Sequence, residues 1–243
     1  MRPDRGLVHG ESGPHSVYLR LTSGPACSRR PRARGGGTAI GTIERRTREL
    51  REREARLLDA ATALMACDDW LAVTIEQIAD RAEYAKGTVY RHFPSKDDLY
   101  ARLVADWNEA TCKTLEEVDA ARPFEAVLRD VVAIAWRRMA GDRVHARLLQ
   151  HVQRADFLAS LAAETRTALA EADGRLLVLL EGLIELGVAE GAIPPAPAEP
   201  RLFAVTALLA GALRLQPIWE SQGGRIDAER AVSDAVLALL AAG

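Results

Sequence analysis

The chain has 243 residues, 48% of them hydrophobic, and a formal net charge of −2. This size allows one or two domains with a buried core. The charge excludes a generally polycationic protein, so binding to nucleic acid would need a local basic patch. Three scattered cysteines, Cys27, Cys67 and Cys112, exclude a disulfide framework or a cysteine zinc site and fit a reducing cytoplasm.

Neither a membrane span nor a secretion signal stands out in the sequence. We find no apolar run that approaches the roughly 20 residues of a membrane-spanning helix. No N-terminal positive charge is followed by an apolar segment. We therefore expect a cytoplasmic protein without a membrane partner.

Residues 1–42 are rich in Pro, Gly, Ser and Arg and show no sustained apolar period. Their segment 28–37, SRRPRARGGG, cannot bury a face, so we expect a disordered, basic N-terminal extension. One interpretation is a solvated tail or an over-long start of the reading frame. The other is a basic arm that follows a DNA minor groove or a track of phosphates.

Helical periodicity starts at Ile43 and continues through two predicted helices. The first is amphipathic, with an apolar stripe formed by Leu57, Leu58, Ala61, Leu64 and Met65. The second begins at Thr74, a good N-cap that is followed three residues later by Gln77, as a capping box requires.

A third helix is expected from Lys86 to Phe93, after a turn at 83–85 and before Pro94. Val89 and Phe93 form its apolar back. Its other side carries cations and hydroxyls without an acidic residue: Lys86, Thr88, Tyr90, Arg91 and His92. Such a side suits the DNA major groove, where a helix-turn-helix unit places its second helix. The alternative is an ordinary helical corner with a solvated basic face.

The rest of the chain is also predicted to be helical. Ser95 caps a fourth helix that runs to about Lys113, with Asp97 and Asp98 near its positive end. Further helices are expected at 124–140, 144–153, 156–190 with a break near 173–174, 200–215 and 227–241. No alternating strand pattern of useful length occurs, so the expected fold class is all-α.

Three segments closely resemble the TetR (tetracycline-repressor-like) family of bacterial transcription regulators. They are LLDAATALM (57–65), VTIEQIADRA (73–82) and KGTVYRHFPSKDDL (86–99). The resemblance implies an N-terminal three-helix DNA-binding domain at 43–104, containing the helix-turn-helix. It also implies a C-terminal helical domain at 105–243 for ligand binding and dimerisation.

The resemblance assigns roles in DNA binding residue by residue. Thr74 and Lys96 resemble phosphate contacts, and Gly87 lets the backbone approach a phosphate closely. Lys86 and Arg91 are the candidates for reading bases, since Arg or Lys to guanine is the commonest specific pairing. The full candidate set is Thr74, Lys86, Gly87, Thr88, Tyr90, Arg91, His92 and Lys96.

Departures from the family pattern lie near the two short helices. Glu83 stands where the family usually has glycine, and a positive φ there would cost on the order of 1 kcal/mol. Ala85 replaces a capping Ser or Thr, a loss of about 1 kcal/mol and one phosphate contact. Residues 69–70, Asp-Trp, replace the usual glycine after the first helix.

The C-terminal half offers candidates for a ligand pocket and a dimer interface. An apolar pocket with a few polar groups could be lined by Trp107, Trp136, Met139, Leu148 and Phe157. A four-helix interface between two copies could use Phe203, Leu208, Gly211, Val232, Val236 and Leu239. For both sets the alternative is ordinary intramolecular core. A two-fold dimer would require a roughly palindromic operator.

Catalysis and metal binding are not expected. His145 and His151 are six residues apart, so they do not share a helix face as two metal ligands would. No nucleophile–base pair or pair of carboxylates suggests an enzyme, and we expect no cofactor beyond a small-molecule effector. The sequence therefore predicts a homodimeric, ligand-responsive DNA-binding repressor in the bacterial cytoplasm. The alternatives are a ligand-independent DNA-binding protein that organises the chromosome, or a helical enzyme or scaffold that does not bind DNA.

Overall fold

The computed structural model describes residues 37–67, 69–152, 154 and 156–242, without the side chains of 37–42, 143 and 150. The predicted extension 1–36, with most of its possible DNA-binding arm, lies outside the described residues. Helix α1 (Gly37–Met65) begins six residues before Ile43, where the sequence pattern placed the start of helical periodicity. Extending a helix that has already nucleated adds a hydrogen bond for each residue fixed, which favours this earlier start.

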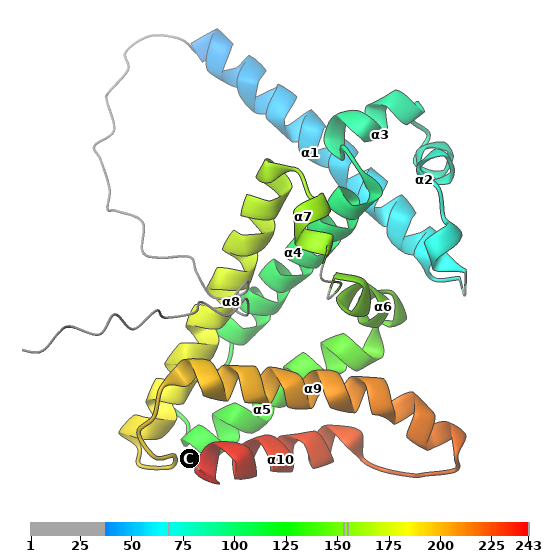
Figure 1. Cartoon of the computed structure of the whole chain (residues 1–243). Coiled ribbons are helices and arrows are strands. Elements are labelled where there is room, and N and C mark those ends of the chain that lie inside the picture. The colour runs from blue at the N-terminus through cyan, green and yellow to red at the C-terminus, as the bar shows by residue number, and fades with distance from the viewer. Residues whose placement is uncertain (1–36, 68, 153, 155, 243) are drawn as a thin grey trace, which may run out of the picture. The chain divides into compact units, whose positions relative to one another are not determined.

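All elements in the described ranges are helices, which confirms the all-α class (Figure 1). After α1 come a 3₁₀ turn η1 (Trp70–Ala72), α2 (Ile75–Arg81), α3 (Lys86–His92) and α4 (Lys96–Glu116). Then follow α5 (Phe124–Gly141), α6 (Arg143–Val152), α7 (Phe157–Ser160), α8 (Ala163–Ala189), α9 (Ala198–Ser221) and α10 (Ala228–Ala242).

The break expected near 173–174 lies instead at 161–162, between α7 and α8. Leu161 is extended there, with φ −77° and ψ 144°. Gly174 stays inside α8, although glycine costs a helix interior about 1 kcal/mol. Helix α8 packs along α4, and the Asp173 carboxylate accepts a hydrogen bond from Asn108 of α4 at 2.7 Å. These tertiary contacts outweigh the local preference at Gly174.

Buried side chains form two clusters. The first joins α1–α4 to α6, α7 and the first half of α8. The second joins α5, the second half of α8, α9 and α10. Helix α4 therefore connects the helix-turn-helix to the remaining helices, because Val104 and Ala105 lie in the same cluster as Val89 and Leu148.

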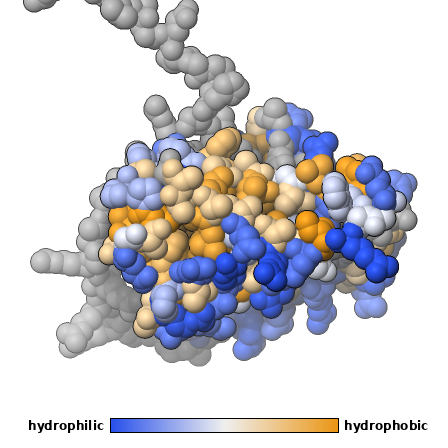
Figure 2. Space-filling model, turned by 90° about the horizontal axis from the view of Figure 1, so that it is seen from below, coloured by the Kyte–Doolittle hydropathy of each residue, from blue (hydrophilic) through white to orange (hydrophobic). Residues whose placement is uncertain are grey.

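Helix α9 is more apolar and longer than the sequence pattern indicated. Its most apolar 18-residue window has a mean hydropathy of 1.4, enough to cross a membrane by length and composition alone. The expectation that no apolar run approaches this length is wrong, since α9 continues beyond Leu215 through Pro217 to Ser221. Phe203 is 73% exposed and Trp219 is 56% exposed. Figure 2 shows apolar residues gathered on the face seen from below, where α9 and α10 lie in Figure 1.

Candidate nucleic-acid interface

A capping box at Thr74 positions helix α2. The Thr74 hydroxyl accepts a hydrogen bond from the Gln77 amide at 3.2 Å, and the Gln77 side chain accepts one from the Thr74 amide at 2.8 Å. This confirms the predicted cap. Ile75 and Ile78 of α2 are buried. Thr74, at the start of this helix, is exposed to solvent.

The turn between α2 and α3 has a residue in a strained conformation. Glu83 has a φ of 60°, in the left-handed region that favours glycine. The Tyr84 amide donates to the Ala79 carbonyl at 2.9 Å and closes the turn. Ala85 is the N-cap of α3 and makes no side-chain capping bond. The predicted costs of Glu83 and Ala85 are therefore present in the fold.

Helix α3 has a buried back and a solvent-exposed outer side. Val89 is fully buried and Phe93 is buried, as predicted. A Cβ placed on Gly87 would meet nothing within 4 Å, so the first turn of the helix is open to close approach. Four residues of α3 are exposed, Lys86, Gly87, Tyr90 and Arg91, and two are partly exposed, Thr88 and His92.

Lys86 has an acidic partner that lies outside its own helix. Its ammonium forms an ion pair with the Glu76 carboxylate of α2. The hydrogen bond to Glu76 raises the pKa of Lys86. The Lys86 ammonium also lies 5.9 Å from the centre of the Tyr90 ring. The Glu76 carboxylate therefore competes with an acceptor on DNA for the Lys86 ammonium.

His92 and Lys96, like Thr88, are only partly exposed. Burial lowers the pKa of His92, which favours the neutral imidazole. The Lys96 ammonium donates to the Leu71 carbonyl and lies 5.6 Å from the centre of the Tyr100 ring. Burial lowers the pKa of Lys96. An ammonium has three donors, so Lys96 can bind the η1 carbonyl and a phosphate together.

The sequence did not indicate a polar network that joins the start of α4 to α6 and α7. The Asp97 carboxylate lies 3.1 Å from His151 Nε2 and accepts hydrogen bonds from Arg154 and Ser160, each at 2.9 Å. Burial opposes the charged form of Asp97. Hydrogen bonds from His151, Ser160 and Arg154 outweigh this effect and lower the pKa of the carboxyl.

Asp98 makes a second connection from the same turn of α4. It is 1% exposed and accepts hydrogen bonds from the Ser95 hydroxyl at 2.7 Å and from the Ala162 amide at 2.9 Å. The sequence identified Asp97 and Asp98 only as favourable charges at a helix start. Their distant partners lie more than 50 residues away, so no local pattern could have shown them.

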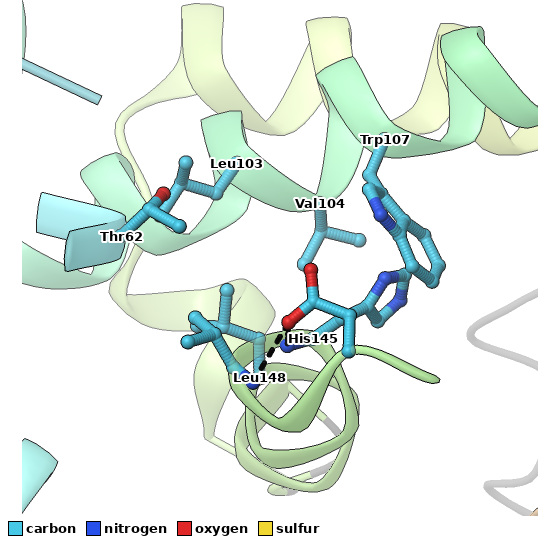
Figure 3. Close-up of a pocket in the computed structure, with 8 residues that line it drawn as sticks. Thr62, Leu103, Val104, Trp107, His145 and Leu148 are labelled. Atoms are coloured by element: carbon cyan, nitrogen blue, oxygen red, sulfur yellow. Dashed lines mark hydrogen bonds between the residues drawn. The ribbon is translucent and has the colours of Figure 1, made fainter. Parts of the chain in front are cut away.

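The five pocket candidates do not lie together. Trp107 and Leu148 line one cavity (Figure 3), together with His145, which the sequence considered only as a metal ligand. Phe157 is fully buried in the first cluster, and Trp136 is buried in the second. Met139, on α5, is partly buried. Only Trp107 and Leu148 thus share a cavity.

The six dimer candidates divide between surface and core. Phe203 of α9 is exposed, and Leu208 and Gly211 are partly buried. Val232 and Val236 of α10 lie in the second cluster, so for these two residues the alternative of ordinary intramolecular core applies. Leu239 packs against the same cluster. Across the described ranges, no three His, Cys, Asp or Glu side chains could together hold a metal ion.

The family profile described as bacterial regulatory proteins, tetR family, matches residues 57–103, which include α2, α3 and the start of α4. Over these residues the chain is similar to this family. KstR, an HTH-type transcriptional repressor of Mycobacterium tuberculosis, is 40% identical over 77 residues, which are 31% of this chain and 35% of KstR. The chain thus matches only about a third of the length of that relative.

Relatives of lower identity align over more of their length. YhgD of Bacillus subtilis, an uncharacterized HTH-type transcriptional regulator, is 26% identical over 73% of this chain and 90% of its own length. The structure of FadR from Bacillus subtilis in complex with stearoyl-CoA has 23% identity and a TM-score of 0.57. It covers 78% of this chain and 98% of FadR. At this identity the likeness shows the fold.

Proposed function

We propose that this chain is a DNA-binding transcriptional repressor that acts as a ligand-responsive homodimer in the bacterial cytoplasm. The observation that carries the proposal is the arrangement of α3. Its cations and hydroxyls lie on the solvent side, and Val89 and Phe93 are buried on the opposite side. The match to the tetR-family profile covers this element. Relatives named as transcriptional repressors favour a regulator over a chromosome organiser, an enzyme or a scaffold.

The exposed groups suggest how the chain would bind duplex DNA. Helix α3 would enter the major groove with Arg91 directed to a base edge, because guanine offers two acceptors to an arginine. Thr74, Thr88 and Lys96 would bind the flanking phosphates, which fix register rather than sequence. Tyr90 and His92 would add backbone contacts, and Lys86 would join after leaving Glu76.

A homodimer would cover the exposed apolar side chains of α9. Four large apolar side chains of α9 are exposed: Phe203, Leu215, Ile218 and Trp219. Such a group on one helix is larger than the single apolar residues that protein surfaces ordinarily expose. We prefer a second copy over a membrane as their partner, because relatives of this family are DNA-binding regulators and a two-fold dimer would match a palindromic operator. Sedimentation without detergent tests this choice: a monomer that binds vesicles would contradict it.

An effector would act by changing the spacing of the two recognition helices. FadR from Bacillus subtilis was crystallised with stearoyl-CoA, and RolR with resorcinol. We propose that a small molecule likewise controls this chain, without a metal or other cofactor. A coupling of ~1–3 kcal/mol would change DNA affinity about 5–150-fold. The Asp97 network offers a route, since it joins α4 to α6 and α7.

Footprinting on the DNA upstream of the chain's own gene tests the proposal. We expect protection of a roughly palindromic site by the wild-type chain, strongest at low salt, where phosphate contacts are strongest. Arg137→Ala is the control variant and should leave this protection unchanged. Arg137 is an exposed arginine of α5 that pairs with Glu229, far along the chain from α3. No protection at low salt anywhere in that region would contradict the regulator.

A further inference from the structure

Helix α1 is longer than the core that it helps to form. Leu57 is the first of its described side chains to be buried, and residues 43–52 are all exposed. The part before Leu57 spans about 30 Å, because a helix rises by about 1.5 Å per residue. In Figure 1 this part, drawn in blue, extends beyond α3. Residues 43–56, here called the projecting segment, therefore bury little surface against the rest of the described chain.

Ion pairs within the projecting segment use only some of its charges. The segment has six arginines and four glutamates. Arg45 pairs with Glu49 at 3.8 Å and Arg48 pairs with Glu52 at 3.9 Å, each four residues apart. Pairs at this spacing stabilise an exposed helix. Two of the arginines thus support the helix, and the other four have no part in these pairs.

Those four arginines have no carboxylate partner among the described residues: Arg46, Arg51, Arg53 and Arg56. Arg46 and Arg53 are nearly two turns apart, so they lie on the same side of α1, about 10 Å from each other along its axis. Arg46 is exposed and Arg53 is partly exposed. These two residues, here called the arginine face, therefore offer two guanidinium groups to an anionic partner.

The arginine face continues the basic surface of α3. Burial is the main cause that lowers the pKa of His92, at the end of α3. The Glu54 carboxylate opposes this effect, and the positive charges of Arg53 and Arg91 add to it. Glu54 itself pairs with Arg102 of α4 at 3.0 Å. Because Arg53 acts on the same imidazole as Arg91, α1 and α3 present one continuous basic surface.

Duplex DNA fits this surface better than a second copy of the chain does. Ile43 is 66% exposed and Leu50 is 42% exposed, which makes a helix–helix contact between two copies the alternative. Such a contact would bring together arginines that have no counterion and repel each other. Duplex DNA instead carries one negative charge per roughly 1.7 Å of its axis, and a guanidinium can bind a phosphate through two parallel hydrogen bonds.

We propose that the projecting segment is a second DNA-binding element, in which Arg46 and Arg53 bind phosphates beside the major-groove site of α3. The inference rests on the proposed function for the identity of its partner. Phosphate contacts fix a protein on the duplex without reading its sequence. The projecting segment would therefore strengthen binding to any duplex and extend the contact beyond the bases that α3 reaches.

The salt dependence of binding to a duplex of random sequence, measured by fluorescence anisotropy with the full chain, tests the arginine face. Arg46→Ala combined with Arg53→Ala should reduce the salt slope by about two. The wild type should then lose about tenfold more affinity than this variant between about 50 and 200 mM salt. Alanine favours a helix, so α1 should stay folded.

Arg45→Ala combined with Arg48→Ala is the matched control. It removes the same charge from the same segment, but from arginines that already pair with glutamates, so it should change the slope by less than half as much. Equal slopes in the wild type and the Arg46–Arg53 variant would overturn the inference. Equal reductions in the two double variants would overturn it as well, because they would show an effect of overall charge alone.

Two further outcomes separate this inference from its alternative and from the proposed function. If Leu50→Ser weakens self-association in sedimentation while the Arg46–Arg53 variant keeps the wild-type slope, the segment binds a second copy and the inference is overturned. No binding of the wild type to the random duplex at low salt would also overturn it. The random duplex contains no operator, so a failed footprint contradicts the repressor alone, and an unchanged slope contradicts the second DNA contact alone.

Discussion

The helix-turn-helix and the α5–α10 region depend on contacts of different range. In α2 and α3 the decisive contacts are local: Gln77 with Thr74, Tyr84 with Ala79. In the other region they connect distant parts of the chain, as where Arg129 of α5 reaches Asp234 of α10 at 2.7 Å. The comparison teaches that the exposed face of α3 rests on local contacts, whereas the α5–α10 region is held by contacts between distant parts of the chain.

The largest expected effect is at Asp98, where the two regions meet. Asp98→Ala leaves the Ala162 amide and the Ser95 hydroxyl without their acceptor, and we expect a loss of about 3 kcal/mol of unfolding free energy. Urea unfolding measures it. Asp130→Ala removes an exposed pair with Arg122 and should cost under about 1 kcal/mol. Equal losses in the two variants would show that Asp98 does not join the regions.

Arg91 and Lys96 test whether the motif separates base reading from phosphate binding. Arg91→Ala should cost about 1–3 kcal/mol of binding at particular base pairs and relax sequence preference there. Lys96→Ala should weaken binding to all sequences alike and reduce the salt slope by about one. Binding measured across mutated operators and salt concentrations distinguishes them. If both variants weaken all operators equally, Arg91 is not a base reader.

His145 predicts a pH dependence that belongs to the other region. Its pKa is lowered to about 2 in the folded chain, whereas an unfolded histidine has a pKa of about 6.5. Below pH 6.5 the unfolded chain binds a proton that the folded chain does not, so stability falls as pH falls. Between pH 7.5 and 5.0 the loss is about 2 kcal/mol.

The control for this pH dependence is the His145→Gln variant, which has no titrating ring at that position. Its unfolding free energy should change less than that of the wild type between pH 7.5 and 5.0. Asp97 should not interfere in this window. Its pKa is lowered by its partners, so its contribution is present above the ordinary carboxyl pKa and is lost only at more acidic pH. The same slope in both proteins would contradict a buried, neutral His145.

The smallest effect is expected at the turn. Glu83→Gly should stabilise the chain by at most about 1 kcal/mol, because glycine tolerates a φ of 60°. The melting temperature measures this change. Gly87→Ala is the comparison, since its added methyl group meets nothing and alanine favours a helix. A destabilising Glu83→Gly would mean that the Glu83 side chain makes a contribution larger than the backbone strain.

The sequence predicted those features that depend on contacts between residues close together in the chain, and it missed those that depend on distant residues. The Thr74 cap and the buried Val89 depend on residues within one or two turns, and both were predicted. For Glu83 the sequence indicated only a strain that would follow from a positive φ, and the structure has that φ. The break at 161–162 was not predicted, since the Ala162 amide is bound by Asp98, 64 residues away. His145 shows the same limit, because its burial depends on side chains that separate helices bring around it.

The pair between Lys86 and Glu76 has a consequence for how the chain would search a genome. Lys86 carries its own fixed counterion. Binding its ammonium to a phosphate releases a cation from the DNA but leaves the Glu76 carboxylate to attract one, so the net gain is small. Only a site with a well-placed base acceptor repays the separation from Glu76. We therefore expect the carboxylate on α2 to weaken binding to random DNA more than binding to an operator, and to shorten the time that the proposed repressor would spend on incorrect sites.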